Sequence, residues 1–233
     1  MMKLTTHELQ KKFWEKDKSK RRSSEHPIVR YVFESKAKKL KYLTNDIHPQ
    51  SILDCGCGNG FFQTYLSKTF NLECAGLDFS SEMIRFNPNP NTIIASVTNI
   101  PFKDNSFDIV VCHGLLHHLP KESHLLAVNE MARVARYYLF LAEPNRNNPA
   151  IALFSIIKPE ERCALLFSKK YLQKLCKQNK QLSIVKIFTD LLVLPNKTPL
   201  FLFPVMKRLD KSSLSSYLGT MTNILCRKIN PQL

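Results

Sequence analysis

Apolar positions in the middle of the chain repeat with two different spacings. Short runs rich in branched apolar residues predict strands, and longer stretches with apolar residues three or four positions apart predict helices. The predicted strands are 51–53, 74–77, 92–95, 108–112 and 137–142, and the predicted helices between them are 61–70, 80–86 and 121–135. This alternation favours a parallel sheet with helices on both faces, with the 108–112 strand, which is apolar after Asp108, at its centre.

The two flanks of this alternating region have patterns of their own. Residues 28–43 have helical periodicity, and residues 168–180 predict a basic amphipathic helix. Residues 182–188 and 220–226 predict two further strands. The expected fold class is therefore α/β and Rossmann-like. It is a doubly wound, mostly parallel seven-stranded sheet with helices on both faces and an N-terminal helical extension.

Composition predicts a division of the chain into two parts. Residues 1–45 would form a basic N-terminal helical arm or lid, in which 16–22 is nearly continuous basic sequence. Residues 46–233 would form the main domain, in which 151–233 supply the substrate-side elements and the last two strands. Trp14 could anchor the arm as a lid or pack as an ordinary apolar residue.

The net charge of +15 is unevenly distributed along the chain. Residues 151–233 carry 14 basic and 4 acidic side chains and residues 1–50 carry 13 and 6, whereas residues 51–150 carry 7 and 9. Basic flanks of this kind attract phosphates, nucleic acid or an anionic membrane surface. The alternative is that these lysines only solvate exposed helices.

Some classes of protein are disfavoured by the sequence. No apolar run approaches the roughly 18 residues of a membrane span, and the N-terminus lacks the apolar stretch of a secretory signal. A cytoplasmic protein, with peripheral association at a membrane as an option, is the expectation. The seven cysteines are odd in number, and Cys55 and Cys57 are too close together for a zinc-ligand pair. Reduced thiols and no metal are therefore expected.

A glycine-rich loop follows the first predicted strand. Three of the six glycines of the chain, Gly56, Gly58 and Gly60, alternate between that strand and the next predicted helix. Glycine permits positive φ and a close approach of the backbone to a ligand. A strand, such a loop and a helix N-terminus together predict a cradle for a nucleotide-like cofactor.

Three features of this loop select among the cofactors. A dinucleotide fingerprint needs a glycine where Phe61 stands, and no Walker-type Gly-Lys-Ser/Thr is present. The loop begins with Asp54, an acid suited to a cationic group. Asp78, which ends the second predicted strand, could accept ribose hydroxyls. S-adenosylmethionine (SAM) meets these conditions because it carries an ammonium, a sulfonium and a ribose but no phosphate.

The sequence resembles the class I SAM-dependent methyltransferase family, in particular the small-molecule branch that includes ubiquinone and menaquinone biosynthesis methyltransferases. Five segments in the right order carry this resemblance. They are Asp54-x-Gly56-x-Gly58-x-Gly60, Gly76-Leu77-Asp78-Phe79-Ser80, Ile100 to Asp108, Leu116-His117-His118-Leu119 with Glu130-x-x-Arg133, and Glu143-Pro144-Asn145.

The resemblance implies a role for each matching position. The loop glycines with Cys57 would pass under the methionine part of SAM, and Asp54 would reach its ammonium. Asp78 would bind the ribose hydroxyls, and Phe79 would lie against the adenine. The remaining implied contacts are those of the adenine edge, Ser96, Val97 and Thr98, and those facing the methyl group, His113 and Gly114.

Candidate catalytic and substrate residues follow from the same positions. Methyl transfer from a sulfonium needs a general base only when the acceptor must lose a proton. His113 is the candidate base, with a lining role as the favoured alternative. His117 and Glu143 are candidate substrate contacts. His117 is more simply explained as closing the helix that follows, and Glu143 as capping the rim.

Three functions remain open for the acceptor. The leading hypothesis is methyl transfer to a small-molecule or lipid-linked acceptor. The alternatives are an RNA (tRNA) methyltransferase that uses the basic flanks and a non-catalytic partner subunit with a methyltransferase fold. Residues 200–208 could touch a membrane or wall an apolar pocket, although packing in the core is the favoured explanation. Nothing in the sequence indicates the oligomeric state.

Overall fold

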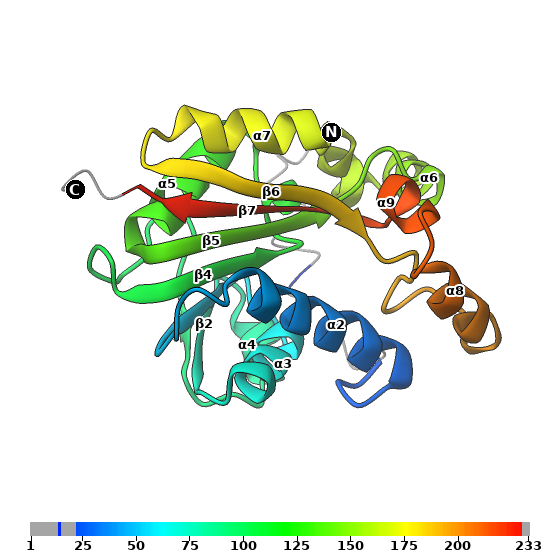
Figure 1. Ribbon diagram of the computed structural model, residues 1–233, viewed down its shortest axis with the longest axis horizontal. Helices are drawn as coiled ribbons and strands as arrows, with labels where there is room; N and C mark the ends of the chain where they lie inside the picture. The colour runs from blue at the N-terminus through cyan, green and yellow to red at the C-terminus, as the bar shows by residue number, and fades with distance from the viewer. Residues whose placement is uncertain (1–13, 15–21, 230–233) are drawn as a thin grey trace, which may run out of the picture.

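A seven-stranded sheet forms the centre of the molecule (Figure 1). The structure is a computed structural model, and it describes Trp14 and residues 22–229. The strands are β1 Ile52–Cys55, β2 Cys74–Asp78, β3 Thr92–Ile94, β4 Phe107–His113, β5 Ala135–Pro144, β6 Leu182–Asp190 and β7 Met221–Lys228. Their order is β3-β2-β1-β4-β5-β7-β6. The first five are parallel, whereas β7 is antiparallel to both of its neighbours. The predicted fold class and the central place of β4 are confirmed.

Helices cover both faces of this sheet. They are α2 Pro27–Leu43, α3 Phe61–Phe70, α4 Ser81–Arg85, α5 His124–Val134, α6 Pro149–Ile157, α7 Lys169–Gln178, α8 Phe203–Leu209 and α9 Leu214–Leu218. Four 3-10 helices occur at Leu116–His118, Lys121–Ser123, Pro159–Leu166 and Leu200–Leu202. The side chains of Ser80, Asn148 and Ser168 accept backbone N–H groups at the starts of α4, α6 and α7. Polar caps of this kind set where each helix begins.

The alternation of side chains along β4 divides the core into two layers. Ile109 and Val111 pack with α2 and α3 on one face, and Val110 and Cys112 pack on the other. Successive side chains of a strand point to opposite faces, so an apolar strand serves two cores at once. All seven cysteines are free thiols, as the sequence predicts.

The predicted helix at 121–135 is wrong in its bounds. Lys121–Ser123 is a 3-10 helix, and the α-helix begins only at His124 and ends at Val134. Ala135 adopts an extended backbone because it pairs with Phe107 of β4. The fifth strand therefore begins directly at the end of the helix and is longer than the apolar run that predicted it.

The expectation of core packing for residues 200–208 is also wrong. The side chains of Leu200, Phe201 and Val205 are 56%, 79% and 59% exposed. Phe203 and Met206 alone of this stretch pack against a small buried cluster that includes residues of α2. Figure 1 shows the reason, because α8 lies at one end of the molecule with no described element outside it.

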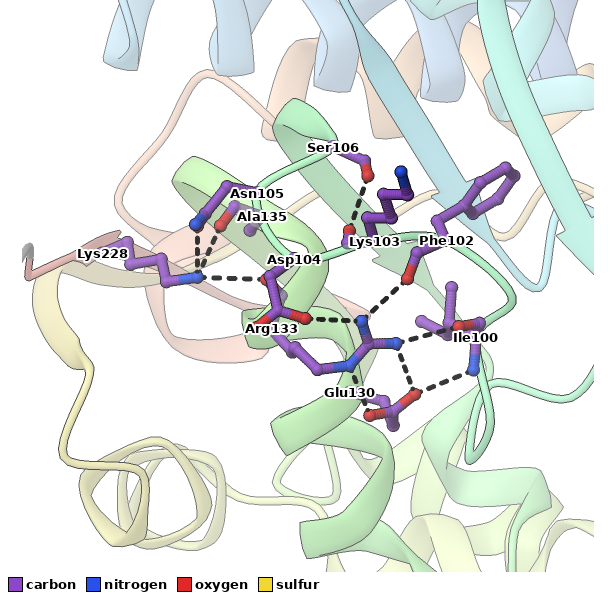
Figure 2. Close-up of polar contacts among 10 residues, drawn as sticks. All are labelled: Ile100, Phe102, Lys103, Asp104, Asn105, Ser106, Glu130, Arg133, Ala135 and Lys228. Atoms are coloured by element: carbon purple, nitrogen blue, oxygen red, sulfur yellow. Dashed lines mark hydrogen bonds and ion pairs between the residues drawn. The ribbon is translucent and has the colours of Figure 1, made fainter.

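A polar network fixes the segment that leads into β4 (Figure 2). Arg133 of α5 donates to the carbonyls of Ile100 and Phe102 at 2.9 and 2.8 Å, and it pairs with Glu130 at 2.8 Å. Glu130 in turn accepts the Ile100 N–H at 2.9 Å. Lys228 of β7 donates to the carbonyl of Ala135 at 2.9 Å. The Glu130-x-x-Arg133 motif therefore joins α5 to the segment that leads into β4.

The N-terminal part of the chain is described in part. The basic run at 16–22 lies outside the described residues except for Arg22, whose guanidinium donates to the carbonyls of Pro195 and Thr198 at 2.7 Å each. Helix α2 packs against α3, with Phe33 near Phe62. The division of the chain at residue 45 stays a prediction. In the described part, no helix has the length and apolarity needed to cross a bilayer.

Candidate functional site

The loop between β1 and α3 brings backbone close to a cavity. Gly56 has a φ of +75°, and a Cβ on it would lie 2.9 Å from the side chain of Leu115. The N–H groups of Gly56 and Cys57 donate to the carbonyl of Leu77 on β2 at 2.8 and 3.0 Å. An alanine here would meet both strain and a clash, so the glycine allows the tight turn.

Two asparagines that were not predicted as site residues donate side-chain hydrogen bonds to this loop. Asn87 donates to the carbonyl of Gly58 at 3.2 Å, and Asn89 donates to that of Gly60 at 3.4 Å. A Cβ on Gly60, which has a φ of +78°, would come within 2.1 Å of Asn87 Oδ1. The two Asn-Pro pairs after α4 were the signal in the sequence, since such pairs favour turns that side chains can stabilise.

A cavity of about 460 Å³ extends from this loop along the carboxyl ends of the parallel strands. Most of the predicted site residues line it: Asp54, Gly56, Cys57, Gly58, Asp78, Phe79, Ser96, Val97, His113, Gly114 and His117. Trp14 lines it too, with its ring 4.9 Å from that of His118. Three predicted residues are not in the lining: Gly60, Thr98 and Glu143. Ligands bind at this edge of α/β sheets because the connecting loops leave a crevice there.

Two carboxylates face the cavity at the glycine-loop end. Asp54 is 1% exposed, and its Oδ2 has no hydrogen-bond partner among the described residues. Burial raises the pKa of Asp54 well above its usual range, and the charge of Asp78 raises it further. Asp78 accepts the N–H groups of Gly58 and Ser80 at 2.9 Å each, while burial raises its pKa. A cation bound here would pair with Oδ2 of Asp54 and would reduce the repulsion between the carboxylates of Asp54 and Asp78.

The strand end at Ser96 has a more local arrangement. Ser96 and Val97 line the cavity, whereas the Thr98 hydroxyl lies 2.8 Å from the Ser96 hydroxyl. The Thr98 N–H also donates to Ser96 Oγ at 3.2 Å. Thr98 therefore orients Ser96, and Ser96 presents its side chain to the cavity.

His113 lies in the cavity wall at the end of β4. Its ring is 5.1 Å from that of Phe33 and 5.4 Å from that of Phe62, and its Nε2 has no hydrogen-bond partner in the described part of the chain. Burial, with the charge of Lys36, lowers the pKa of His113 to about 3. A neutral imidazole that is this hard to protonate is a weak proton acceptor, but it can form a hydrogen bond with a ligand.

Glu143 forms a buried pair with His117 near the other end of the cavity. It is fully buried and accepts the N–H groups of Leu115 and Leu116 at 3.0 and 2.8 Å. Its second oxygen lies 2.7 Å from Nδ1 of His117. Glu143 therefore caps the 3-10 helix that carries His117 and fixes the orientation of that ring.

The opposite nitrogen of His117 faces a second carboxylate. Nε2 lies 3.4 Å from Glu161, a residue of the 3-10 helix Pro159–Leu166 that also lines the cavity. Burial alone would lower the pKa of His117, but hydrogen bonds to Glu143 and Glu161 outweigh it and raise the pKa to about 9. No motif in the sequence pointed to Glu161, which lies outside every segment that carries the resemblance.

His117, His118 and Glu161 bring ligand atoms within 4.8 Å of one another. Both nitrogens of His117 already face carboxylates, so the cluster is satisfied as a hydrogen-bonded ion pair. The absence of a metal stays a prediction.

Residues 53–137 match the model of a methyltransferase domain family. The whole fold is similar to that of a SAM-dependent methyltransferase from Archaeoglobus fulgidus, with a TM-score of 0.62 at 17% identity over 85% of this chain and 94% of that one. It is also similar to magnesium protoporphyrin IX methyltransferase from Synechocystis, solved with bound SAM, with a TM-score of 0.62 at 15% identity over 98% of this chain and 99% of that one. Residues 53–137 are thus similar to a methyltransferase domain, and the fold around them is that of SAM-dependent methyltransferases.

Relatives of the methyltransferase domain differ in what their names say of the acceptor. An uncharacterized protein of Methanocaldococcus jannaschii is 41% identical over 36% of this chain and 36% of its own length. A mouse protein named as a probable tRNA methyltransferase 9B is 31% identical over 41% of this chain and 22% of its own. Norajmaline N-methyltransferase of Rauvolfia serpentina is 26% identical over 55% of this chain and 44% of its own length. The chain thus spans less than half the length of these relatives.

The residues of the methyltransferase domain fit SAM, the cofactor of this family. The open oxygen of buried Asp54 suits an ammonium group, and Gly56 and Gly58, which carry no side chains, line the same cavity. Asp78 retains acceptor capacity beyond its two backbone donors, as ribose hydroxyls would require.

Proposed function

We propose that this protein binds SAM and transfers its methyl group to a small-molecule acceptor with an apolar body. One observation carries the proposal: a single cavity joins Asp54 and Asp78 at one end to His117 and Glu161 at the other. A cofactor site and an acceptor site that share a cavity satisfy the need for proximity and alignment in a displacement reaction.

The cofactor end would be held by the residues that the sequence singled out. Asp54 would bind the ammonium, Asp78 the ribose, and Phe79 and Val97 the adenine. When bound, SAM supplies an electrophilic methyl group on its sulfonium. His113, neutral and wedged between Phe33 and Phe62, would orient the acceptor beside that methyl group.

The acceptor end would handle the proton. An N–H or O–H acceptor that gains the methyl group must release one proton. A bound SAM would give up its positive charge in the transfer and leave as the neutral sulfide. We assign that proton to Nε2 of His117, with Glu143 holding Nδ1 and stabilising the resulting imidazolium. Because the pKa of His117 is raised to about 9, the ring is neutral and able to accept the proton chiefly at alkaline pH, so methyl transfer should increase as the pH rises towards 9. His117 replaces His113 as the proposed base, because burial leaves His113 a weak proton acceptor.

The walls of the acceptor end favour a small apolar acceptor. Phe33, Phe61, Pro195 and Met221 line the cavity, and its exposed lining is mostly apolar. An RNA base could enter such a site only by leaving its stack, and its phosphates would need a basic surface at the mouth. A tRNA acceptor is the second candidate, supported by the basic flanks and by the named activity of the mouse relative.

Calorimetric titration with SAM and with S-adenosylhomocysteine tests the cofactor half of the proposal. We expect micromolar binding that Asp78→Ala weakens about 10- to 100-fold, because charge-assisted hydrogen bonds to the ligand are lost. Asp104→Ala is the matched control, since that carboxylate pairs with Arg133 on the surface, away from the cavity. No binding of either ligand by folded protein would refute the proposal and favour the non-catalytic alternative.

Transfer of radiolabelled methyl groups tests the acceptor half. The same protein is offered a small-molecule extract and, separately, total tRNA. Label in the organic-soluble fraction supports the proposal. Label in tRNA alone would replace it with the second candidate.

A further inference from the structure

One end of the molecule exposes an unusual amount of apolar surface. Of the eighteen large apolar side chains that are exposed in the described part of the chain, ten lie in α6, the 3-10 helix Leu200–Leu202, α8 and α9. We call these four segments the apolar rim. The most exposed of these side chains are Leu153, Ile156, Ile157, Leu200, Phe201, Val205 and Tyr217.

The sheet topology explains why these segments meet. Helix α6 follows the carboxyl end of β5, while α8 and α9 lie between the carboxyl end of β6 and the start of β7, which pairs with the end of β5. Figure 1 shows α6, α8 and α9 together at this end of the molecule. Asn145 donates to the carbonyl of Gly219 at 2.8 Å, and Asn148 donates to that of Leu218, so the ends of α6 and α9 are joined.

The apolar rim borders the cavity. Pro144, just before α6, and Glu161, just after it, line the cavity, as does the 194–197 loop that precedes the 3-10 helix Leu200–Leu202. Lys197 of that loop lies 5.4 Å above the ring of Phe154 in α6. Residues that directly precede or follow segments of the apolar rim thus line the acceptor end of the cavity.

The charges around the apolar rim are mainly positive. Lys207, Arg208 and Lys211 lie on or just after α8, and Lys197 lies before it. The one acid in this stretch, Asp210, is turned inward to accept the Leu192 N–H. Exposed apolar side chains flanked by lysine and arginine match an anionic bilayer, where the apolar groups enter the acyl boundary and the basic groups stay among the headgroups.

We propose that the apolar rim docks on an anionic lipid bilayer and that the acceptor enters the cavity from the lipid phase. The docking stands independently of the reaction. The origin of the acceptor rests on the proposed methyl transfer. RNA is a poorer match, because most of the protruding surface is apolar and would stay in water beside a phosphate backbone.

Co-sedimentation with vesicles tests the docking on the full chain without any cofactor. We expect binding to vesicles of phosphatidylcholine mixed with phosphatidylserine and much less binding to phosphatidylcholine alone. Phe201→Ser combined with Val205→Ser should weaken binding by on the order of tenfold or more, since two inserted apolar groups are lost. Tyr42→Ser combined with Val185→Ser is the matched control, because both residues are exposed but lie away from the apolar rim.

SAM titration of every variant separates the two proposals. Unchanged SAM binding with lost vesicle binding supports the docking and leaves the methyl-transfer proposal untouched. The docking is overturned if mixed vesicles do not bind the wild-type chain, or if both double variants bind them equally. It is also overturned if Phe201→Ser with Val205→Ser instead dissolves a dimer of the chain or abolishes tRNA binding while vesicle binding persists.

Discussion

The two ends of the cavity are built in different ways. The cofactor end comes from one continuous stretch, residues 53–98, in which strand ends, a glycine loop and two carboxylates follow one another. The acceptor end is assembled from α2, two 3-10 helices, the 194–197 loop and β7. The first is a local motif that a family model can match, whereas the second depends on how distant segments pack.

The two ends also differ in electrostatics. Asp54 and Asp78 lie near each other with no cation paired to them in the described part of the chain, and burial raises the pKa of both. Glu143 and Glu161 instead flank His117. At the cofactor end, the two carboxylates would therefore be paired only when a cationic ligand binds. At the acceptor end, Glu143 and Glu161 are already paired with His117 without a ligand. Three experiments can break or sharpen this comparison.

Removing a buried charge should have the largest effect, and it concerns the scaffold of the acceptor end. Lys36 of α2 is 1% exposed and bonds to Asp190 at 3.0 Å and Asn223 at 2.6 Å. Lys36→Met should lower the free energy of unfolding by about 3–5 kcal/mol, because it leaves Asp190 buried without its partner. Chemical denaturation measures this. Lys38→Met, on the exposed face of the same helix, should cost less than about 1 kcal/mol, and equal losses in the two variants would contradict the prediction.

An intermediate effect is expected at the glycine loop. Gly56→Ala should lower the free energy of unfolding by about 1–3 kcal/mol through its positive φ and its clash with Leu115, and SAM affinity should fall with it. Gly114→Ala is a close control, because its φ of +68° is similar but its Cβ would meet only His117 Cε1 at 3.8 Å. Denaturation and calorimetry should rank Gly56→Ala as the worse variant. A reversed order would show that the loop tolerates side chains.

The smallest effect is the change that a single carboxylate, Glu161, makes to the dependence of stability on pH at the acceptor end. The pKa of His117 is raised to about 9 in the folded protein, above its unfolded value of about 6.5. The stabilisation is therefore complete below about pH 6.5 and is lost as the pH rises through about 9. Glu161→Gln removes one of the two carboxylates and should flatten this loss. Denaturation curves across that range check it, and parallel pH profiles for the two proteins would contradict it.

Much of the cofactor end could be predicted from the sequence. Strand, loop and helix follow one another there, so local rules alone predicted that Asp54, Gly56 and Asp78 lie near one another, and all three line the cavity. Their contacts to SAM stay predictions. Gly60 and Thr98 lie outside the cavity lining: the Gly60 carbonyl accepts a hydrogen bond from Asn89, and the Thr98 hydroxyl bonds to that of Ser96. Asn87 and Asn89 were missed, since their contacts depend on the α4 turn folding back onto the loop.

The acceptor end could be predicted only in part. His117 and Glu143 were candidates, but their pairing joins residues 26 positions apart, and Glu161 carried no sequence signal. Residues 200–208 were predicted to pack in the core, but most of them are exposed. The prediction failed because an apolar pattern has the same periodicity whether its face meets a core, a partner or solvent.

The sequence by itself determined the order of strands and helices, the sharp turn at the glycine loop and the acids that surround it, because each depends on backbone preferences within a few residues. The tertiary structure alone decided which nitrogen of His117 faces Glu143 and which faces Glu161, that Glu143 is buried, and that α6, α8 and α9 gather into an apolar rim. Those outcomes depend on the antiparallel return of β7 between β5 and β6, which brings distant segments to one edge of the sheet.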